Sequence, residues 1–73
     1  MTGEEFIRRI RRLGRDRGIA VRFESRRGKG SHGRLYYGEH FTTVKDRRKE
    51  MSPGLLVSML SQLGLSRKDI RRN

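Results

Sequence analysis

The sequence lacks cysteine, has few hydrophobic residues and has few groups that could hold a metal ion. Without cysteine the chain can form neither disulfides nor thiolate zinc sites. Hydrophobic residues make up 32% of the 73 positions, so we expect one small core in a single domain spanning residues 1–73. Two histidines and eight carboxylates leave little for a metal site. We therefore expect no metal and no other cofactor.

Long apolar runs are also missing. No stretch approaches the ~20 apolar residues that a bilayer-spanning helix needs. The chain starts with a charged segment that contains Glu4 and Glu5, which does not fit a secretory signal peptide. These absences predict a cytoplasmic protein with no membrane partner.

Positive charge is what the chain has in excess. Nineteen Lys and Arg residues against eight acidic residues give a formal net charge of +11. Such a surface attracts polyanions through the release of their counterions. Arginine, whose planar guanidinium suits paired phosphate contacts and stacking on bases, outnumbers lysine. The composition favours a nucleic-acid partner over an anionic membrane or an acidic protein.

Hydrophobic periodicity predicts two helices. The first follows a capping box from Thr2 to Glu5, ends at Gly14 or Gly18, and has an apolar stripe of Phe6, Ile7, Ile10 and Leu13. Its opposite side carries Arg8, Arg11, Arg12 and Arg15. The second follows the N-cap Ser52 and the first-turn Pro53, and its apolar stripe is Leu55, Leu56, Met59, Leu60 and Leu63. We expect both stripes to lie in the core.

Three strands are expected between these helices. Ile19, Val21 and Phe23 alternate with polar residues or alanine, and two further strands are expected at 32–37 and 40–45. Gly38-Glu39 between them is typical of a two-residue type II′ hairpin. The order predicts an α+β fold of the form α-β-β-β-α, with a three-stranded antiparallel sheet and two helices on one face.

The predicted hairpin fixes which side chains share a face. It predicts three cross-strand pairs: Tyr37 with His40, Leu35 with Thr42, and His32 with Lys45. One face then holds His32, Arg34, Tyr36, Phe41, Thr43 and Lys45, which suit phosphate contact and base stacking. The core face holds Leu35, Tyr37, Thr42 and Val44. His32 and His40 fall on opposite faces, about 15 Å or more apart, so we expect no two-histidine pair and a solvated His40.

Residues 26–34 form a basic, glycine-rich segment that ends at the expected strand. Glycines allow positive φ and let main-chain N–H groups approach an anion, so we expect a phosphate-binding loop here. Lys29 and Arg34 add positive charge, and His32 is the residue type best suited to proton transfer near neutral pH. Phosphate donors and one general base are a minimal set for cleaving RNA. The alternative for His32 is a loop histidine that hydrogen-bonds the backbone.

Five segments follow one another along the chain: Gly30-Ser31-His32, Leu35-Tyr36-Tyr37-Gly38, Phe41-Thr42-Thr43-Val44, Pro53-Gly54-Leu55-Leu56 and Leu63-Gly64-Leu65. Together they resemble the HicA toxins of bacterial toxin–antitoxin pairs, over nearly the whole chain. The resemblance implies a double-stranded-RNA-binding-like α-β-β-β-α fold, cleavage of messenger RNA, and neutralisation by a HicB-type antitoxin. It also implies that His32 is the catalytic histidine. Many members carry a proline and a second histidine after the third strand, whereas this chain reads Val44-Lys45-Asp46-Arg47.

The sequence thus predicts a toxin that is a metal-independent endoribonuclease acting on mRNA. Neutral His32 would take the proton from a ribose 2′-hydroxyl that attacks the adjacent phosphorus, and attack by water is left open, as is the general acid. The expected RNA-binding residues are Lys29, Gly30, Ser31, Arg34, Tyr36 and Lys45. One alternative is a non-catalytic basic RNA-binding domain, and another is a basic scaffold for an acidic protein.

Overall fold

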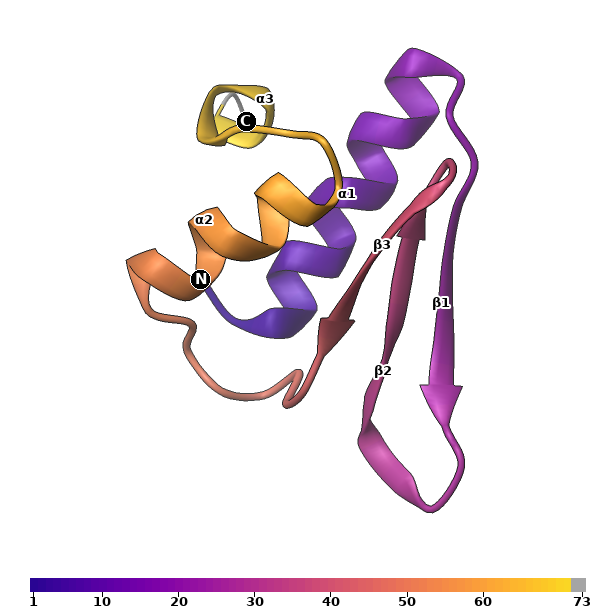
Figure 1. Cartoon of the computed structure of the whole chain (residues 1–73), viewed down its shortest axis with the longest axis vertical. Coiled ribbons are helices and arrows are strands. Elements are labelled where there is room, and N and C mark those ends of the chain that lie inside the picture. Colours follow the sequence, from indigo (N-terminus) through magenta and orange to yellow (C-terminus); the bar gives the residue numbers. More distant parts are fainter. Residues whose placement is uncertain (72–73) are drawn as a thin grey trace.

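The computed structural model describes residues 1–71, and for residues 29–31 it describes the main chain alone. The described residues form α1 (Gly3–Arg17), β1 (Val21–Arg26), β2 (Lys29–Tyr37), β3 (His40–Val44), α2 (Pro53–Gln62) and α3 (Arg67–Arg71) (Figure 1). The strands make one antiparallel sheet in the order β1-β2-β3. α1 packs against β1 and β2, and α2 packs against β3. The predicted α+β class, the element order α-β-β-β-α and the antiparallel three-stranded sheet are confirmed, and α3 follows the second helix.

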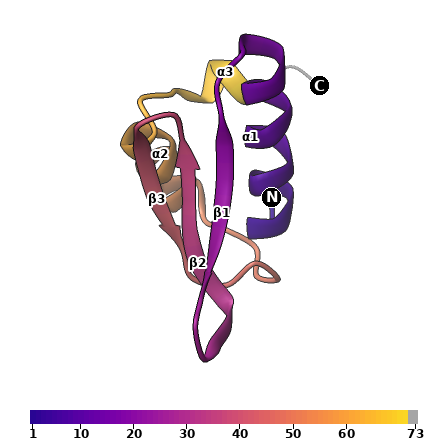
Figure 2. The ribbon, with the colours of Figure 1, turned by 90° about the vertical axis from the view of Figure 1, so that its right-hand side faces the viewer.

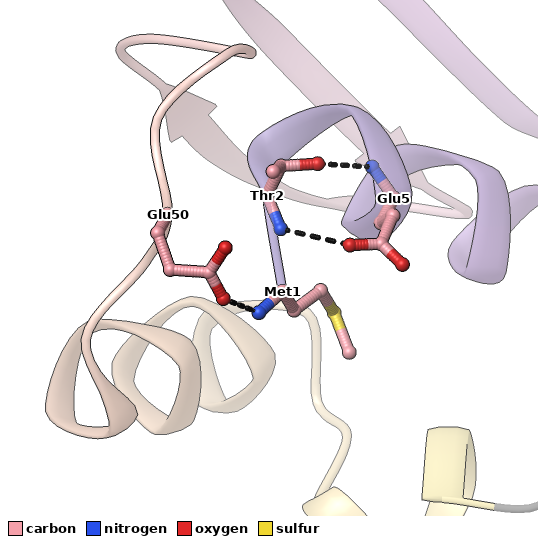
Figure 3. Close-up of polar contacts among 4 residues, drawn as sticks. All are labelled: Met1, Thr2, Glu5 and Glu50. Carbon is pink, nitrogen blue, oxygen red and sulfur yellow. Dashed lines mark hydrogen bonds and ion pairs between the residues drawn. The ribbon is translucent and has the colours of Figure 1, made fainter.

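The start of α1 is capped as predicted. The Glu5 N–H donates to Thr2 Oγ1 and the Thr2 N–H donates to a Glu5 carboxylate oxygen, each over 3.2 Å (Figure 3). The helix runs on to Gly18, which has a φ of +69°. Gly14, the other predicted end, lies inside the helix, where a Cβ would be 2.7 Å from the carbonyl oxygen of Ile19. Glycine at position 14 therefore lets the helix pack closely on the chain that enters β1.

The segment between β3 and α2 is tied to the start of α1. The Met1 amino group pairs with the Glu50 carboxylate (Figure 3), and the Met51 N–H donates to the Met1 carbonyl over 2.9 Å. The Glu4 N–H donates to the Arg47 carbonyl over 2.9 Å. These contacts hold the segment after β3 against the start of the helix. The same segment forms one wall of a hollow in the protein surface.

The sheet has the predicted register between β2 and β3. Tyr37 pairs with His40 and Leu35 pairs with Thr42 across a turn in which Gly38 has a φ of +62°. The ladder ends at the pair of Gly33 with Val44, so the predicted pair of His32 with Lys45 lies beyond it. The predicted core face of these strands is buried: Leu35, Tyr37, Thr42 and Val44. The Thr42 hydroxyl, which is 1% exposed, donates to the Gln62 side-chain oxygen.

The core lies between this face of the sheet and the helices. The helices contribute Phe6, Ile7, Ile10, Leu56, Met59, Leu60 and Ile70, joined by Leu63 after α2. The prediction of Leu55 in the core is wrong, because Leu55 is 49% exposed. Ile19, expected in the first strand, precedes β1 and is 37% exposed. Leu56, Met59, Leu60 and Leu63 already complete one helical stripe, so Leu55 falls beside it. No helix within residues 1–71 is long and apolar enough to cross a membrane.

Polar contacts join α3 to α1. Arg17 donates to Asp69 Oδ1 over 2.7 Å, and Arg9 donates to the Ile70 carbonyl over 3.1 Å. The Ser66 N–H donates to Asp69 Oδ2 over 2.8 Å and caps the short helix. The hydrogen bond from Arg17, aided by that from Ser66, holds the pKa of Asp69 below its usual value. Arg9 and Arg17 therefore have structural partners on α3, and Arg22 pairs locally with Glu24.

Candidate nucleic-acid interface

The glycine-rich basic segment is a β-hairpin. β1 continues to Arg26 and β2 already begins at Lys29, so the chain reverses at Arg27 and Gly28, where Gly28 has a φ of +76°. The expected start of the strand at His32 is therefore wrong, because residues 29–31 already belong to β2. A tight turn needs one glycine with positive φ, and Gly28 provides it. Figures 1 and 2 show this turn as the end of the sheet that projects beyond the helices.

The ladder of this hairpin is interrupted next to His32. Ser25 pairs with Gly33, so an unbroken ladder would pair Arg26 with His32, but Arg26 pairs with Lys29. The register thus shifts by three residues between Ser25 and Arg26, an irregularity of the β-bulge type, which locally bends a strand and redirects a side chain. His32 is therefore positioned by an irregularity in β2 rather than by a free loop.

His32 is half-buried and lies between two surface hollows. The first hollow is on the open side of the sheet and is also lined by Glu24, Arg26, Arg34 and Thr43. The second is lined by Thr43 and by the segment after β3 that is tied to α1, including Lys45, Asp46, Lys49 and Glu50. Among the described residues, the His32 side chain forms no hydrogen bond. Its imidazole is thus accessible to a ligand from either hollow.

Gly33 holds the main chain beside His32 in close packing. A Cβ at Gly33 would lie 2.5 Å from Phe23 Cζ and would also collide with the Glu24 carbonyl oxygen. The Phe23 ring therefore packs over the bare α-carbon of Gly33. This contact fixes the strand next to the bulge, and a glycine is required there because no other side chain fits.

The open face of the sheet carries alternating guanidinium groups and aromatic rings. The Arg22 guanidinium lies 4.2 Å from the centroid of the Tyr36 ring, and the Arg34 guanidinium lies 4.8 Å from that of Phe41. The centroids of the Tyr36 and Phe41 rings are 5.7 Å apart. Phe41 is 45% exposed and Tyr36 is half-buried. We call these four residues the aromatic–arginine cluster; it offers flat surfaces and positive charge, as stacking of bases requires.

The structure brings some predicted site residues together and separates others. Arg34 and Tyr36 belong to the aromatic–arginine cluster, and Lys45 lines a hollow with His32. Of Lys29, Gly30 and Ser31 the structure describes the main chain alone, which belongs to β2, so the predicted roles of the Lys29 and Ser31 side chains lie outside the described residues. His40 is exposed, as predicted, and lies beside the turn between β2 and β3, at the opposite end of the sheet from Gly28. Its ring faces Gly64, where a Cβ would be 3.3 Å from His40 Nε2.

Comparison with family models, curated proteins and solved structures gives no match for this chain. The site must therefore be interpreted from its own geometry. Within residues 1–71, no three His, Cys, Asp or Glu side chains come together as metal ligands do. What the interface offers is one accessible imidazole, several cations and exposed aromatic rings.

Sequence reasoning missed two members of this site. Glu24 lines the first hollow beside His32, and its carboxylate pairs with Arg22. Both follow from the β1–β2 register, in which Arg22 pairs with Tyr36 and Glu24 with Arg34. Since the bulge next to His32 breaks that register, the alternation of residues 19–24 alone could not assign these partners.

Proposed function

We propose that this protein is an endoribonuclease that cleaves mRNA, with His32 as its general base. The observation that carries the proposal is the position of His32. It is an accessible histidine at a β-bulge, in a hollow with Arg26 and Arg34 and adjoining exposed aromatic rings. Guanidinium groups bind phosphate, aromatic rings stack on bases, and imidazole moves protons near neutral pH. These are the groups that cleavage of an RNA phosphodiester needs.

In the proposed reaction, neutral His32 takes the proton of a ribose 2′-hydroxyl while that oxygen attacks the adjacent phosphorus. The new bond joins the 2′-oxygen to phosphorus, and the bond from phosphorus to the 5′-oxygen breaks. The departing 5′-oxygen takes a proton from solvent and protonated His32 returns its proton to solvent, so the products are a 2′,3′-cyclic phosphate and a 5′-hydroxyl. Arg34 and Lys45 stabilise the charge that develops on the phosphoryl oxygens. If water attacks instead, no cyclic phosphate forms, and end-group analysis of the products distinguishes the two routes.

The fold and partners of the proposed enzyme follow from the HicA resemblance. The α-β-β-β-α arrangement is assigned to the double-stranded-RNA-binding-like class, and the enzyme acts as a toxin in the cytoplasm. A HicB-type antitoxin neutralises it by covering His32 with a surface that bears carboxylates and competes with RNA for the same cations. Association steered in this way weakens as salt rises.

The second candidate function is a non-catalytic RNA-binding domain. The aromatic–arginine cluster favours it, because stacking and phosphate contact need no histidine. The two candidates differ only in what His32 does.

Expression of the chain alone in bacteria tests the choice. If the protein is an enzyme, the native chain should arrest growth and deplete mRNA. The His32→Gln protein, expressed at the same level, should do neither. His40→Gln is the matched control and keeps full toxicity, since His40 lies at the far end of the hairpin. In extracts the cleavage should persist in EDTA, because no cluster of metal ligands occurs in residues 1–71. Toxicity of the His32→Gln protein equal to that of the native chain would leave only the binding-domain function.

A further inference from the structure

A second group of cations lies on α1, away from His32. Arg8, Arg11, Arg12 and Arg15 are exposed on the outer side of this helix, and we call them the α1 arginine face. They line a hollow together with Phe23 and Arg47, whose guanidinium lies 5.1 Å from the centroid of the Phe23 ring, and with Glu4 and Glu5 from the first turn of the helix. The hollow thus combines a row of positive charges and an aromatic ring on the sheet with two carboxylates at the start of α1, and positive charge prevails.

The α1 arginine face differs from the other arginines of the same helix. Arg9 and Arg17 hold α3 through a carbonyl and a carboxylate. In contrast, no side chain of the α1 arginine face forms a hydrogen bond or ion pair with another described residue. Like charges three and four positions apart destabilise a helix. The like charges therefore weaken the helix slightly, and the row of guanidinium groups is left open to an anionic ligand.

The spacing of the face suits a ligand with regularly repeated negative charges. Arg8, Arg12 and Arg15 stand about one helical turn apart, roughly 5 Å for each turn, so they form a straight row of about 10 Å. A nucleic-acid backbone carries one phosphate per nucleotide and can meet successive members of such a row. The aromatic ring of Phe23, at the side of the hollow, adds a surface on which a base can stack.

Phe23 lies between the α1 arginine face and the strand that carries His32. The Phe23 ring lines the arginine hollow and packs on Gly33, the neighbour of His32, which lines the other hollow. Figure 2 shows α1 beside β1 in full view, whereas α2 lies behind the sheet. A strand of RNA can therefore follow α1, pass the edge of the sheet at β1 and reach His32 without crossing the core.

We propose that the α1 arginine face is a second RNA-binding surface, which holds the part of a long RNA that flanks the segment at His32. This rests on the proposed binding of RNA and does not depend on cleavage. The substrate class follows: RNA long enough to span both surfaces binds better than a short fragment that occupies the His32 site alone.

The test measures binding of fluorescent single-stranded RNA to the His32→Ala protein, so that nothing is cleaved. Arg8→Gln/Arg12→Gln/Arg15→Gln is compared with a control that removes the same charge from α3, Arg67→Gln/Lys68→Gln/Arg71→Gln. Glutamine keeps a helix propensity close to that of arginine, so α1 should fold normally. For an RNA of about 20 nucleotides, we expect the α1 variant to bind at least tenfold more weakly at physiological salt. Each lost phosphate contact should reduce the magnitude of the slope of log K against log salt by about 0.7, so the loss of three contacts should reduce it by about 2.

Cleavage by proteins with native His32 supplies the second readout. The α1 variant should raise KM for the long RNA, with kcat nearly unchanged, and should leave cleavage of an RNA of about 4 nucleotides as it is. Equal loss of affinity in the α3 control would show that net charge alone matters, and would overturn the proposal. Unchanged RNA binding together with loss of binding to polyglutamate would overturn it in favour of an acidic protein partner. If no protein cleaves RNA but the α1 variant still has the smaller salt slope of RNA binding, the second RNA-binding surface is supported and the ribonuclease function is excluded.

Discussion

The two ends of the β1–β2–β3 sheet are built differently. Near Gly38 the ladder is unbroken, helices cover one face, and Leu35 and Thr42 are almost fully buried. Near Gly28 the ladder is displaced, the hairpin projects beyond the helices, and His32 is half-buried without a hydrogen bond to another described residue (Figure 1). The first end contributes to the core, whereas the second holds the groups that the proposed reaction would use. A chain with so few hydrophobic residues separates these tasks along one sheet.

The largest expected effect is on folding, at the covered end. Leu35→Ala removes a side chain that is 0% exposed, so the free energy of unfolding should fall by about 2–5 kcal/mol, enough to unfold much of a small domain. Phe41→Ala is the control from the open face of the same sheet and should cost less than about 1.5 kcal/mol, since Phe41 is 45% exposed. Urea unfolding followed by circular dichroism measures both. Equal losses would contradict the division of the sheet into two faces.

Substitution by alanine should change stability in opposite directions at Gly33, in the projecting part of the sheet, and at Gly54, in α2. Gly33→Ala places a Cβ against the Phe23 ring and the Glu24 carbonyl, so the protein should lose about 1–3 kcal/mol of stability. Gly54→Ala is the matched change in α2, where a Cβ meets nothing within 4 Å, and should gain up to about 1 kcal/mol. Thermal unfolding of the two variants gives the comparison. A Gly33→Ala protein as stable as the native one would mean that the packing beside His32 is not tight.

The covered end of the sheet could be read from the sequence, and the projecting end could not. Leu35 and Tyr37 alternate with polar residues, and Gly38-Glu39 fixed the register of β2 against β3. The capping box at Thr2 and the N-cap at Ser52 marked both helix starts. At the other end, the glycines of residues 28–33 suggested a loop, because local composition does not reveal a bulged strand that long-range pairing creates. The prediction that Leu55 is buried was wrong, because the apolar stripe of this helix is wider than the face that α2 buries.

A smaller effect is expected on the affinity for RNA at the aromatic–arginine cluster. Tyr36→Leu keeps an apolar side chain in the strand but removes the ring between Arg22 and Phe41. Binding of single-stranded RNA should weaken by about 1 kcal/mol, the lower end of what one stacked base contributes. Tyr36→Phe keeps the ring and should bind as the native protein does. Fluorescence anisotropy with the His32→Ala versions of both proteins measures this difference, and equal affinities would exclude stacking on Tyr36.

The smallest effect concerns pH and the contact of α3 with α1. Arg17 and Ser66 lower the pKa of Asp69, so its carboxylate stabilises the fold above the ordinary aspartate value of 3.8. That contribution is lost as the pH falls from about 4 through the lower pKa of the folded protein. The melting temperature of the native protein should therefore drop more steeply in acid than that of Asp69→Asn. Identical curves below pH 4 would mean that the pair with Arg17 contributes nothing.

One set of measurements on His32→Ala and His40→Ala tests the central claim most directly. Each purified protein, shown free of contaminating nuclease, is assayed for its unfolding midpoint, its affinity for RNA and its rate of RNA cleavage. Both variants should unfold and bind RNA as the native protein does, because charge supplies most of the affinity. Cleavage should disappear in His32→Ala and persist in His40→Ala. A His32→Ala protein that cleaves RNA at the native rate would contradict the assignment of His32 as the general base.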